Sequence, residues 1–338
     1  MSSKKILSII LALIISIIAC SCTSEEKQEE SMEKTPVGMH GQLSVKGTQL
    51  VDSEGKPYQL RGMSTHGMTW FPSFVNEDAF RTLRDEWHTN VVRLAMYIDE
   101  WGNEVCYMKN KDGSREMMEN GVDICLKLGM YVIIDWHVLN PGDPSKYTDE
   151  AVEFFEYITK KYAEYPNVIY EICNEPNSGA KWDTSVKPYA ETVIPVIRKN
   201  DSDAVIIVGT PLWCQEIDKA LEDPLEFENV MYALHFYADT HKQWLRDRLI
   251  SCVDKGLPVF VSEFGCCDAS GNGNNNFYET EKWLTLLDSK NISYCNWALA
   301  NKDEACCVVA PDVEKTSAWK ENELSESGKW ISEWFKKH

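Results

Sequence analysis

Apolar residues along this chain of 338 gather in short runs that are separated by longer amphipathic stretches. The amphipathic stretches, such as TDEAVEFFEYITKKYAEY and TSVKPYAETVIPVIRKN, repeat their apolar residues at helical spacing. The apolar runs between them are typical of buried strands. We predict eight strands, near residues 59–63, 90–95, 130–136, 168–174, 204–209, 230–235, 258–263 and 292–297.

The alternation of strands with helices predicts a parallel sheet covered by helices. Eight such units without an obvious second domain favour a closed (β/α)8 barrel of the TIM type. A doubly wound open sheet is the alternative, and it is disfavoured because no G-x-G-x-x-G follows the first strand. Before the barrel, QLSVKGTQLVDSEGKPYQL alternates apolar and polar residues around Gly47 and Gly55, which predicts a short N-terminal β-hairpin.

Polar and aromatic residues follow each predicted strand, at the end where such barrels carry their chemistry. This pattern is expected of an active-site cleft built from all eight strand ends. In strand order the residues are His66 with Trp70, Arg93 with Tyr97, His137, Asn174 with Glu175, Trp213, His235 with Tyr237, Glu263, and Trp297.

Two of the strands end on glutamates, Glu175 in VIYEICNEPN and Glu263 in PVFVSEFG. Because strands four and seven face each other across the ring, we expect both carboxylates to enter one cleft. Two carboxylates flanking an aromatic groove suit glycoside hydrolysis, in which one protonates the leaving oxygen and the other attacks or stabilises the anomeric carbon. Arg93 and Tyr237 are expected to keep Glu263 ionised, which leaves Glu175 as the protonated partner.

Each of these residues also has a purely structural interpretation. A single glutamate at a strand end often forms a salt bridge, and Arg93 is suitably placed to neutralise Glu171, which has the same strand parity as Glu175. His137 and His235 are alternatively core histidines with satisfied hydrogen bonds. The tryptophans are either core residues or flat platforms for sugar rings, the choice being open for Trp70, Trp213 and Trp297.

The formal net charge of −19 argues against nucleic acid and anionic membranes as partners, so a neutral substrate fits better. Lys4 and Lys5 precede ILSIILALIISIIA, and this apolar run ends in IIACSCTSEE. We therefore predict a lipoprotein-type signal peptide over residues 1–19, with Cys20 or Cys22 as the lipidated residue; an ordinary secretory signal is the alternative. Residues 20–37 are predicted as an acidic flexible tether and residues 38–338 as one catalytic domain.

Ten cysteines lie in the predicted catalytic domain, without a C-x-x-C pair or a Cys/His cluster at zinc spacing. Most of them sit within apolar runs, which is typical of small buried thiols. The doublets Cys266–Cys267 and Cys306–Cys307 follow strands seven and eight, which are neighbours in a barrel. A disulfide between the two doublets is therefore a hypothesis that this geometry allows.

The segments NVVRLAMY, IIDWH, IYEICNEPN, ALHFYA, VSEFG and NWALANKDE occur in this order. Their series resembles glycoside hydrolase family 5, and within it the bacterial cellulases of the second subfamily, over about residues 40–338. The resemblance implies a retaining endo-β-1,4-glucanase that needs neither a metal nor a cofactor. It also implies Glu175 as the acid/base and Glu263 as the nucleophile of a covalent glycosyl-enzyme intermediate.

The resemblance assigns further roles to the surrounding residues. Asn174 matches the residue that hydrogen-bonds the sugar 2-hydroxyl, and Trp213 matches a platform on the leaving-group side. Trp297 matches the stacking residue at the point of cleavage, followed by a non-prolyl cis peptide bond to Ala298. The supporting residues around the carboxylates are Arg93, His137, His235 and Tyr237, and those lining the glycone side are His66, Trp70, Tyr97, Lys302 and Glu304.

Other functions are compatible with parts of this pattern. A family 5 enzyme could prefer mannan, xylan or mixed-linkage glucan instead. A metal-dependent barrel hydrolase using His66, His137 and His235 is disfavoured because THGM offers one histidine where such sites use His-x-His. A lipid-anchored, non-catalytic glycan-binding protein would not need both glutamates. We expect a monomer at the bacterial cell envelope, lipid-anchored or secreted, that prefers soluble or amorphous β-glucan because no binding module follows the last helix.

Overall fold

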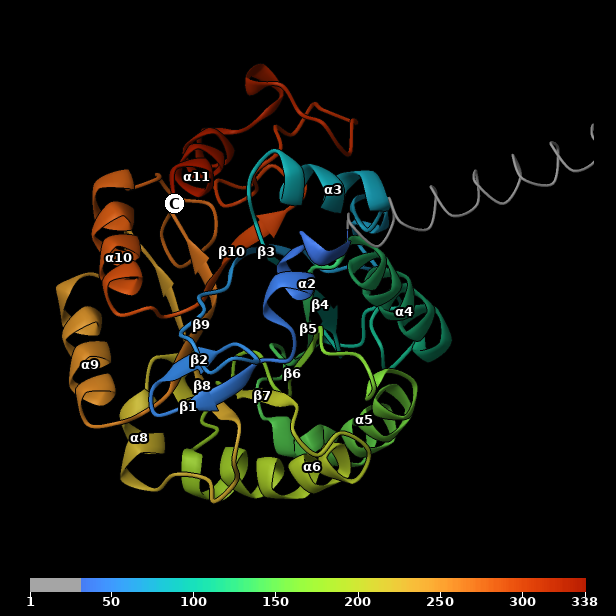
Figure 1. The fold of residues 1–338 in the computed structure, drawn as a ribbon, viewed down its shortest axis with the longest axis vertical. Helices are drawn as coiled ribbons and strands as arrows, with labels where there is room; N and C mark the ends of the chain where they lie inside the picture. The colour runs from blue at the N-terminus through green and yellow to red at the C-terminus, as the bar shows by residue number, and fades with distance from the viewer. Residues whose placement is uncertain (1–31) are drawn as a thin grey trace, which may run out of the picture.

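The computed structural model describes residues 32–338 (Figure 1). Its centre is a closed barrel of eight parallel strands in the order β10-β3-β4-β5-β6-β7-β8-β9, which confirms the predicted fold. Each strand overlaps one of the eight predicted apolar runs. The strands are β3 (Arg61–Thr65), β4 (Val91–Tyr97), β5 (Tyr131–His137), β6 (Val168–Glu171), β7 (Val205–Val208), β8 (Val230–Tyr237), β9 (Val259–Gly265) and β10 (Tyr294–Leu299).

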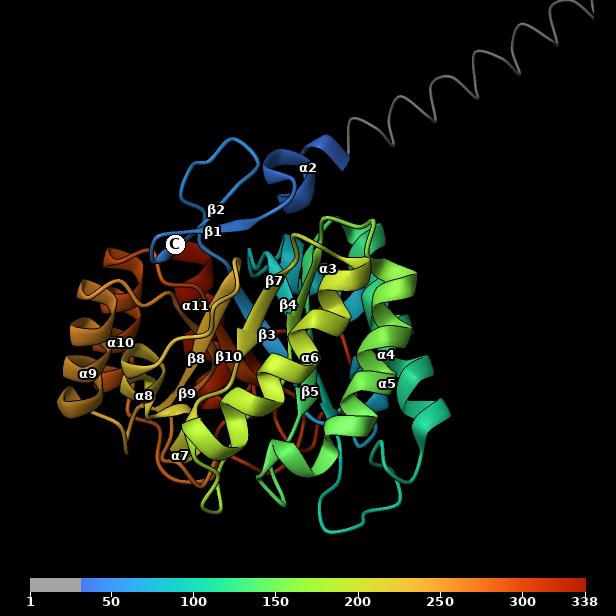
Figure 2. The same cartoon turned by 90° about the horizontal axis from the view of Figure 1, so that it is seen from below.

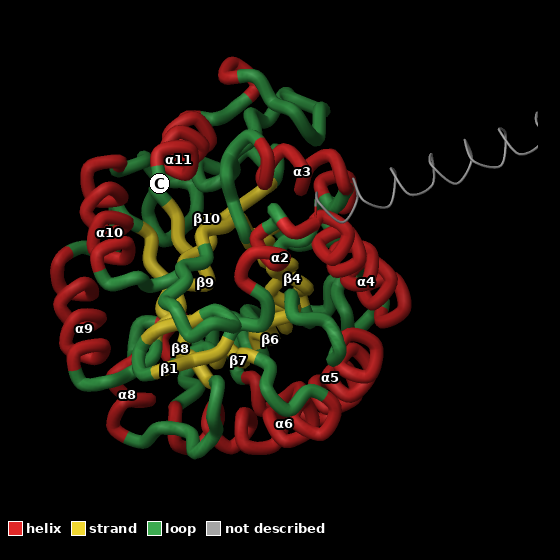
Figure 3. Tube along the Cα trace, viewed as in Figure 1, coloured by secondary structure: helices red, strands yellow, loops and turns green. Residues whose placement is uncertain are grey.

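Helices form a layer around the outside of the barrel (Figure 3). The longer ones are α3 (Glu77–Asp85), α4 (Lys111–Leu128), α5 (Thr148–Tyr162), α6 (Lys187–Asn200), α9 (Gln243–Asp254), α10 (Phe277–Ser289) and α11 (Glu326–Lys337). The shorter ones are α2 (Pro36–His40), α7 (Pro211–Cys214), α8 (Ile217–Glu222), three 3₁₀ turns at Pro72–Phe74, Pro144–Tyr147 and Glu321–Glu323, and a π turn at Trp182–Val186.

Helix α5 illustrates why the amphipathic stretches become the outer layer. Its buried residues Phe154, Phe155, Ile158 and Tyr162 recur every three or four positions, so they form one stripe that faces the strands. Phe154 stacks at 5.2 Å between ring centroids on Trp136 of β5, whose side chain points out of the barrel. The periodicity that predicted the helix therefore also fixes its packing face.

The predicted hairpin is present as β1 (Ser44–Lys46) and β2 (Gln49–Val51), which pair antiparallel. It lies across the end of the barrel where the strands begin (Figure 2), and Leu43 and Leu50 pack into the core inside the barrel. Gly47 has a φ of +63°, which suits the tight turn between the two strands. The hairpin closes the end opposite to the one that carries the strand-end residues.

Ordered packing begins slightly before the predicted domain boundary. Thr35 is buried and accepts a hydrogen bond from the Gly38 amide at the start of α2, and Val37 packs against the core of the barrel. The end of the tether predicted at residue 37 is therefore a few residues too late. The predicted signal peptide and both candidate lipidation sites, Cys20 and Cys22, lie outside the described residues. Within residues 32–338, every helix is too short or too polar to cross a membrane.

The contact between α10 and β8 gives a test of this packing. Trp283 of α10 is fully buried, stacks on Phe236 at 4.1 Å between centroids, and donates from its indole N–H to the His241 carbonyl. We expect Trp283→Ala to lower the free energy of unfolding by about 3–5 kcal/mol, through lost contacts and a residual cavity. The midpoint of urea unfolding measures this change.

Trp244 on the neighbouring helix α9 provides the matched control, because its side chain is half exposed. Trp244→Ala should shift the free energy of unfolding by no more than about 0.5 kcal/mol. Equal losses in the two variants would contradict the packing described for α10.

Candidate active site

A cleft of about 730 Å³ opens at the end of the barrel where the strands finish. All but two of the predicted site residues line it. The two exceptions, Arg93 and Asn174, lie beneath its floor and are almost completely buried. The structure therefore brings the predicted residues together at one place, which the strand-end pattern had indicated.

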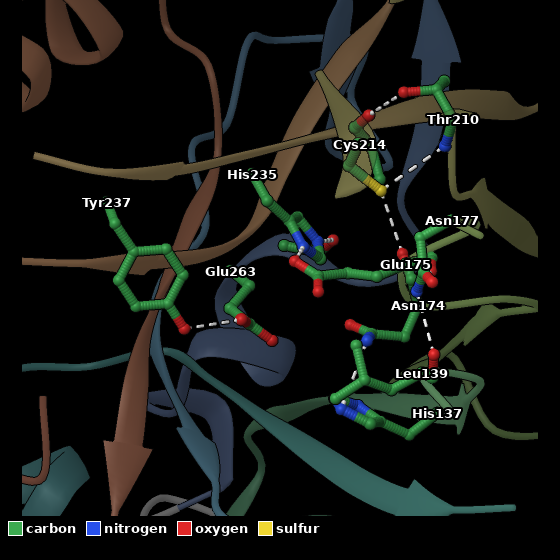
Figure 4. A network of polar contacts seen from close by, with 12 residues as sticks. His137, Leu139, Asn174, Glu175, Asn177, Thr210, Cys214, His235, Tyr237 and Glu263 are labelled. Atoms are coloured by element: carbon green, nitrogen blue, oxygen red, sulfur yellow. Dashed lines mark hydrogen bonds and ion pairs between the residues drawn. The ribbon is translucent and has the colours of Figure 1, made fainter. Parts of the chain in front are cut away.

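The two glutamates meet in this cleft. One carboxylate oxygen of Glu175 and one of Glu263 lie within 4.8 Å of each other and of a His235 ring nitrogen. The strands that carry them, β6 and β9, are three positions apart in the ring of eight. The prediction that these two strands lie directly opposite each other is therefore wrong. The carboxylates nevertheless converge, because the two side chains point toward each other (Figure 4).

An irregularity in β9 explains how Glu263 reaches the cleft. Ala233 of β8 pairs with Phe260 of β9, and His235 of β8 pairs with Glu263 of β9. Between these two pairs, β9 contains one more residue than β8. The pairing with β10 shows the same extra residue. Such a β-bulge interrupts the strict alternation of side chains, so the neighbouring Ser262 and Glu263 both contribute to the site.

Arg93 is the buried cation around which the floor of the site is organised. Its guanidinium is paired with Glu171 at 2.7 Å, with Asp135 at 3.0 Å and with Glu263 at 3.1 Å. It also donates to the Asn174 side-chain oxygen at 2.6 Å. Arg93 thus makes both contacts that were considered for it, since it neutralises Glu171 and also holds Glu263.

Glu263 receives two hydrogen bonds that stabilise its ionised form. Arg93 donates to one carboxylate oxygen at 3.1 Å. The Tyr237 hydroxyl donates to the other at 2.8 Å, as Figure 4 shows. Burial, together with the neighbouring Glu175, raises the pKa of Glu263 above its ordinary value, and His235 and Arg93 limit that rise. With two donors and a cation in contact, the carboxylate has the environment of a nucleophile.

Glu175 has the opposite environment. Burial raises the pKa of Glu175 to about 7, because the charged form loses its hydration and no cation touches its carboxylate. Its one side-chain partner among the described residues is the His235 Nδ1 atom, at 2.8 Å. Glu175 therefore holds a proton at a pH where an exposed glutamate would have lost it.

The hydrogen bonds around His235 indicate where that proton lies. The Ser262 hydroxyl donates to Glu171 at 2.7 Å, so its oxygen is left to accept from His235 Nε2–H at 2.9 Å. Burial lowers the pKa of His235 to about 4, so the ring is neutral and its Nδ1 atom carries a lone pair. A neutral ring of this tautomer accepts a hydrogen bond from protonated Glu175, which is the form a general acid needs.

His137 is fixed in a similar way. Its Nδ1 atom lies 2.6 Å from Asp135, and its Nε2 atom accepts from the Asn174 amide at 3.2 Å. Burial and the nearby Arg93 hold the pKa of His137 well below its usual range, so this ring is also neutral. Burial raises the pKa of Asp135 to about 7, against the opposing effect of Arg93. Arg93, Asp135 and His137 together orient the Asn174 side chain beside the carboxylates.

Aromatic rings form one wall of the cleft. Trp297 packs at 5.4 Å from His137 and 5.0 Å from His66, and Trp70 packs at 4.4 Å from Tyr97. The peptide bond between Trp297 and Ala298 is cis, as the family resemblance implied. This wall provides the flat apolar faces that sugar rings stack on.

Trp213 stands apart from this wall and is held by an unusual turn. Leu212, Trp213 and Cys214 all have positive φ, between 54° and 60°. The turn is anchored by Cys214, whose sulfur accepts from the Thr210 amide and donates to the Asn174 carbonyl (Figure 4). The strained turn leaves the Trp213 ring 43% exposed at the cleft, so it is not a core residue.

The remaining predicted residues lie at the rim near Trp297. Glu304 pairs with Lys302 at 2.5 Å and with His66 at 3.8 Å. His66 is buried in the aromatic wall and Lys302 is exposed, so Glu304 bridges a buried and a solvent-exposed side chain. These three side chains line the cleft on the side where the resemblance places the glycone subsites.

Sequence reasoning missed two residues that support the carboxylates, Asp135 and Ser262. Asp135 shares strand parity with His137 in IIDWH, and this parity would have placed both inside the barrel. Ser262 was missed because Glu263 was assumed to face inward by regular alternation, which would have turned its neighbour Ser262 outward; the bulge in β9 lets both face the site. Further cleft residues that were not predicted are Glu100, Leu139, Gln215, Thr240, His241, Ala269, Ser270 and Gly271.

The histidines of the metal-dependent alternative do not form a metal site together. His66 contacts Glu304, and both ring nitrogens of His137 and of His235 are engaged by protein groups. Within residues 32–338, two groups do bring three potential ligands within 4.8 Å. They are Glu175 with His235 and Glu263, and Glu304 with Cys306 and Cys307.

Comparison with known proteins identifies the family. Residues 51–303 match a family model described as cellulase, glycosyl hydrolase family 5. The chain belongs to glycosyl hydrolase family 5. An endoglucanase of Clostridium saccharobutylicum is 44% identical over 328 residues, which cover 97% of this chain and 71% of the relative. Endoglucanase 5 of Pectobacterium carotovorum subsp. carotovorum is 45% identical over 303 residues, covering 90% of this chain and 59% of the relative.

Solved structures of family 5 cellulases have the same fold. The cellulase Cel5C_n is 47% identical with a TM-score of 0.85, over 90% of this chain and 94% of that one. The catalytic domain of a Thermobifida fusca endoglucanase is 37% identical with a TM-score of 0.85, over 89% and 99% of the two chains. The predicted family and the predicted enzyme class, a glycoside hydrolase, are confirmed.

The hydroxyl of Tyr237 provides a test of the site's electrostatics. We expect Tyr237→Phe to lower kcat/KM of this family 5 enzyme roughly tenfold to a hundredfold, since a hydrogen bond to a charged group contributes about 1.5–3 kcal/mol. The acidic limb of the pH–rate profile should move to higher pH, because the ionised form of Glu263 loses a donor. The alkaline limb should still fall as the pH rises through about 7, where Glu175 loses its proton.

Tyr165→Phe is the control, because Tyr165 is exposed and remote from the cleft. Its profile should match that of the wild type. An acidic limb that stays in place in Tyr237→Phe would show that this hydroxyl does not control the ionisation of Glu263.

Proposed function

We propose that this protein is a retaining endo-β-1,4-glucanase in which Glu263 is the nucleophile and Glu175 is the general acid/base. The observation that carries the proposal is the approach of the two carboxylates to within 4.8 Å. Retaining enzymes hold their carboxyl groups about 5–5.5 Å apart, whereas inverting enzymes need about 6.5–9.5 Å to admit a water molecule. The endoglucanase relatives support the same activity.

In the first step, Glu263 attacks the anomeric carbon and Glu175 donates its proton to the leaving glycosidic oxygen. The glycosidic bond breaks, and a covalent ester forms between the sugar and Glu263. Protonated Glu175 is prepared for this step because neutral His235 accepts its hydrogen bond and does not compete as a proton donor. The shorter glucan chain then leaves with the proton it has received.

In the second step, Glu175 is ionised and takes a proton from a water molecule that attacks the same carbon. The ester to Glu263 breaks and the configuration at the anomeric carbon is restored. Arg93 and Tyr237 stabilise the carboxylate as it leaves, through the same two hydrogen bonds that hold it before attack. We assign to Asn174 a hydrogen bond to the sugar 2-hydroxyl, as the family resemblance implies.

The charge balance of the cleft favours an oxocarbenium-like transition state. Arg93 is the cation in contact with Asp135, Glu171 and Glu263, while His137 and His235 are neutral. The floor thus carries excess negative charge in a region shielded from water. Fixed negative charge of this kind stabilises positive charge that develops on the sugar ring.

The shape of the cleft supports a β-glucan chain as substrate. Trp70 and Trp297 provide stacking faces on the glycone side, and exposed Trp213 provides one for the leaving-group side. The Thermobifida fusca relative has been solved in complex with cellotetraose. We propose soluble or amorphous β-1,4-glucan as the preferred substrate, with xylan and mannan as poorer ones.

We further propose that the enzyme works as a monomer at the bacterial cell envelope, either lipid-anchored through Cys20 or Cys22 or secreted. The envelope location rests on the N-terminal sequence alone, in which a charged start, an apolar run and a cysteine follow one another. An envelope location suits an enzyme whose polymeric substrate does not enter cells.

Matched substitutions separate the two carboxylates. On carboxymethylcellulose and barley β-glucan, we expect Glu175→Gln to release reducing sugar about 10²–10⁴-fold more slowly, because the leaving group is no longer protonated. On 2,4-dinitrophenyl cellobioside, whose leaving group needs no proton, Glu175→Gln should still form the glycosyl-enzyme at a rate near that of the wild type. Glu263→Gln should be inactive on both kinds of substrate, because the bond to carbon does not form.

Glu153→Gln is the control, since Glu153 is an exposed residue of α5. It should match the wild type on every substrate, and the wild type should act faster on both glucans than on glucomannan or xylan. Activity of Glu263→Gln on the aryl cellobioside would exclude it as the nucleophile. Binding of glucan without release of sugar by the wild type would favour the glycan-binding alternative.

A further inference from the structure

Three buried thiols and a carboxylate meet beside the cleft, in loops that the proposed reaction does not use. Cys267 lies just after β9, and Cys306 with Cys307 lies in the segment after β10. Because β9 and β10 are neighbours in the barrel, these two loops lie against each other. All ten cysteines of the described part of the chain are free thiols, so the disulfide considered from the sequence is not formed here.

The distances within this group suit a common ligand. One Glu304 carboxylate oxygen and the sulfurs of Cys306 and Cys307 all lie within 4.8 Å of one another. The Cys306 sulfur is 3.9 Å from Glu304 Oε2. Cys267 lies outside this set of three but belongs to the same buried cluster as Cys306 and Cys307, which it joins from the other loop. Cys266, its neighbour in sequence, instead packs with the core under the helices.

Backbone hydrogen bonds hold both loops in place. The Cys306 amide donates to the Gly271 carbonyl at 3.0 Å, and the Cys306 carbonyl accepts from Ala298 at 3.1 Å. The Cys307 amide donates to the Glu304 carbonyl at 3.1 Å. The thiols are 0–1% exposed and therefore have defined positions. A preorganised group of ligands costs little to assemble when an ion arrives.

We propose that Cys267, Cys306, Cys307 and Glu304 form a binding site for a thiophilic divalent cation, with Zn²⁺ as the biological candidate. Three thiolates and one carboxylate are a donor set that zinc accepts, and soft ligands of this type discriminate against Mg²⁺ and Ca²⁺. Zn–S bonds of about 2.3 Å in a tetrahedron place the sulfurs roughly 3.8 Å apart. The donor atoms of Glu304, Cys306 and Cys307 already lie within 4.8 Å of one another, and Cys267 would move toward them to complete the tetrahedron.

The loop between β9 and α10 provides the route of entry. Gly271 covers the thiols with a φ of +80°, and a Cβ atom there would lie 3.5 Å from the Cys306 sulfur. Ala269 and Ser270 beside it are exposed and line the cleft. An ion therefore reaches the sulfurs from the cleft by displacement of a short surface loop.

The raised pKa values of Cys267 and Cys306 keep these two thiols protonated before an ion binds. The hydrogen bond to Cys306 and burial raise the pKa of Cys267, so it is unreactive as a free thiol at neutral pH. Binding of a divalent cation must displace the thiol protons, since the thiolate is the ligand. The same substitution of a metal for protons occurs at other cysteine-rich sites.

Occupancy would affect substrate binding through Glu304. This carboxylate now pairs with Lys302 and His66 and lines the cleft, so coordination would draw it away from both partners. Glu175 and Glu263 contact none of the proposed ligands. The expected effect of the ion is therefore a higher KM for soluble β-glucan with little change in kcat.

Cadmium titration of the full chain tests the proposal. The protein is kept reduced with a phosphine, freed of metal with a chelator, and titrated with Cd²⁺ in excess Mg²⁺, which occupies hard sites on the acidic surface. We expect a cadmium–thiolate charge-transfer band in the ultraviolet that saturates at one ion per chain. Cys306→Ser and Cys267→Ser should each lose most of this band, and saturating Cd²⁺ should raise KM severalfold in the wild type.

Cys252→Ser is the matched control, because Cys252 is a buried thiol of α9 outside the group. It should retain the band and the shift in KM, and urea unfolding should show that all three variants are folded. A missing band in the wild type, or a band that survives in both Cys306→Ser and Cys267→Ser, would overturn the site. A saturated band with an unchanged KM would overturn its connection to the cleft.

Discussion

The pairing of Arg93 with three acidic side chains is the interaction on which the site depends. A guanidinium without any solvent exposure sits in the barrel among Asp135, Glu171 and Glu263. Removing one partner from a buried charge group typically costs about 3–5 kcal/mol, because it leaves an uncompensated charge. The cluster therefore positions the nucleophile and at the same time ties together the side chains of β4, β5, β6 and β9.

This arrangement also separates the protonation states of the two glutamates. Glu263 touches Arg93 and Tyr237, whereas Glu175 touches neutral His235 and has a pKa of about 7. Two carboxylates within 4.8 Å cannot both be ionised without a large penalty. The proton is assigned to Glu175 because the cation lies on the other side of the pair, and the fixed tautomer of His235 supports that assignment.

The fold and most of the cleft could be predicted from the sequence because both follow from simple periodicities. Apolar runs mark the strands, and side chains at the ends of parallel strands must gather at one rim. The exceptions are deviations from regular geometry. The bulge in β9 that lets Glu263 face inward beside Ser262, and the left-handed turn that presents Trp213, have no signature in residue type.

The cysteine doublets show a different limit. Their sequence positions predicted that the loops after β9 and β10 would meet, and Cys267 and Cys306 are in contact. Sequence parity did not reveal that Cys266 points into the core under the helices while Cys267 points toward the cleft side. That difference depends on the direction of each side chain in an irregular loop. Because of it, we propose a set of metal ligands at this place and not the disulfide that the sequence allowed.

The stereochemistry of the first product tests the central claim most directly. Proton NMR during hydrolysis of a cello-oligosaccharide follows the anomeric signals of the new reducing end before mutarotation. Double displacement by Glu263 and Glu175 predicts that the β-anomer appears first and the α-anomer grows only later. Initial appearance of the α-anomer would mean a single displacement by water, and it would contradict the roles assigned to the two glutamates.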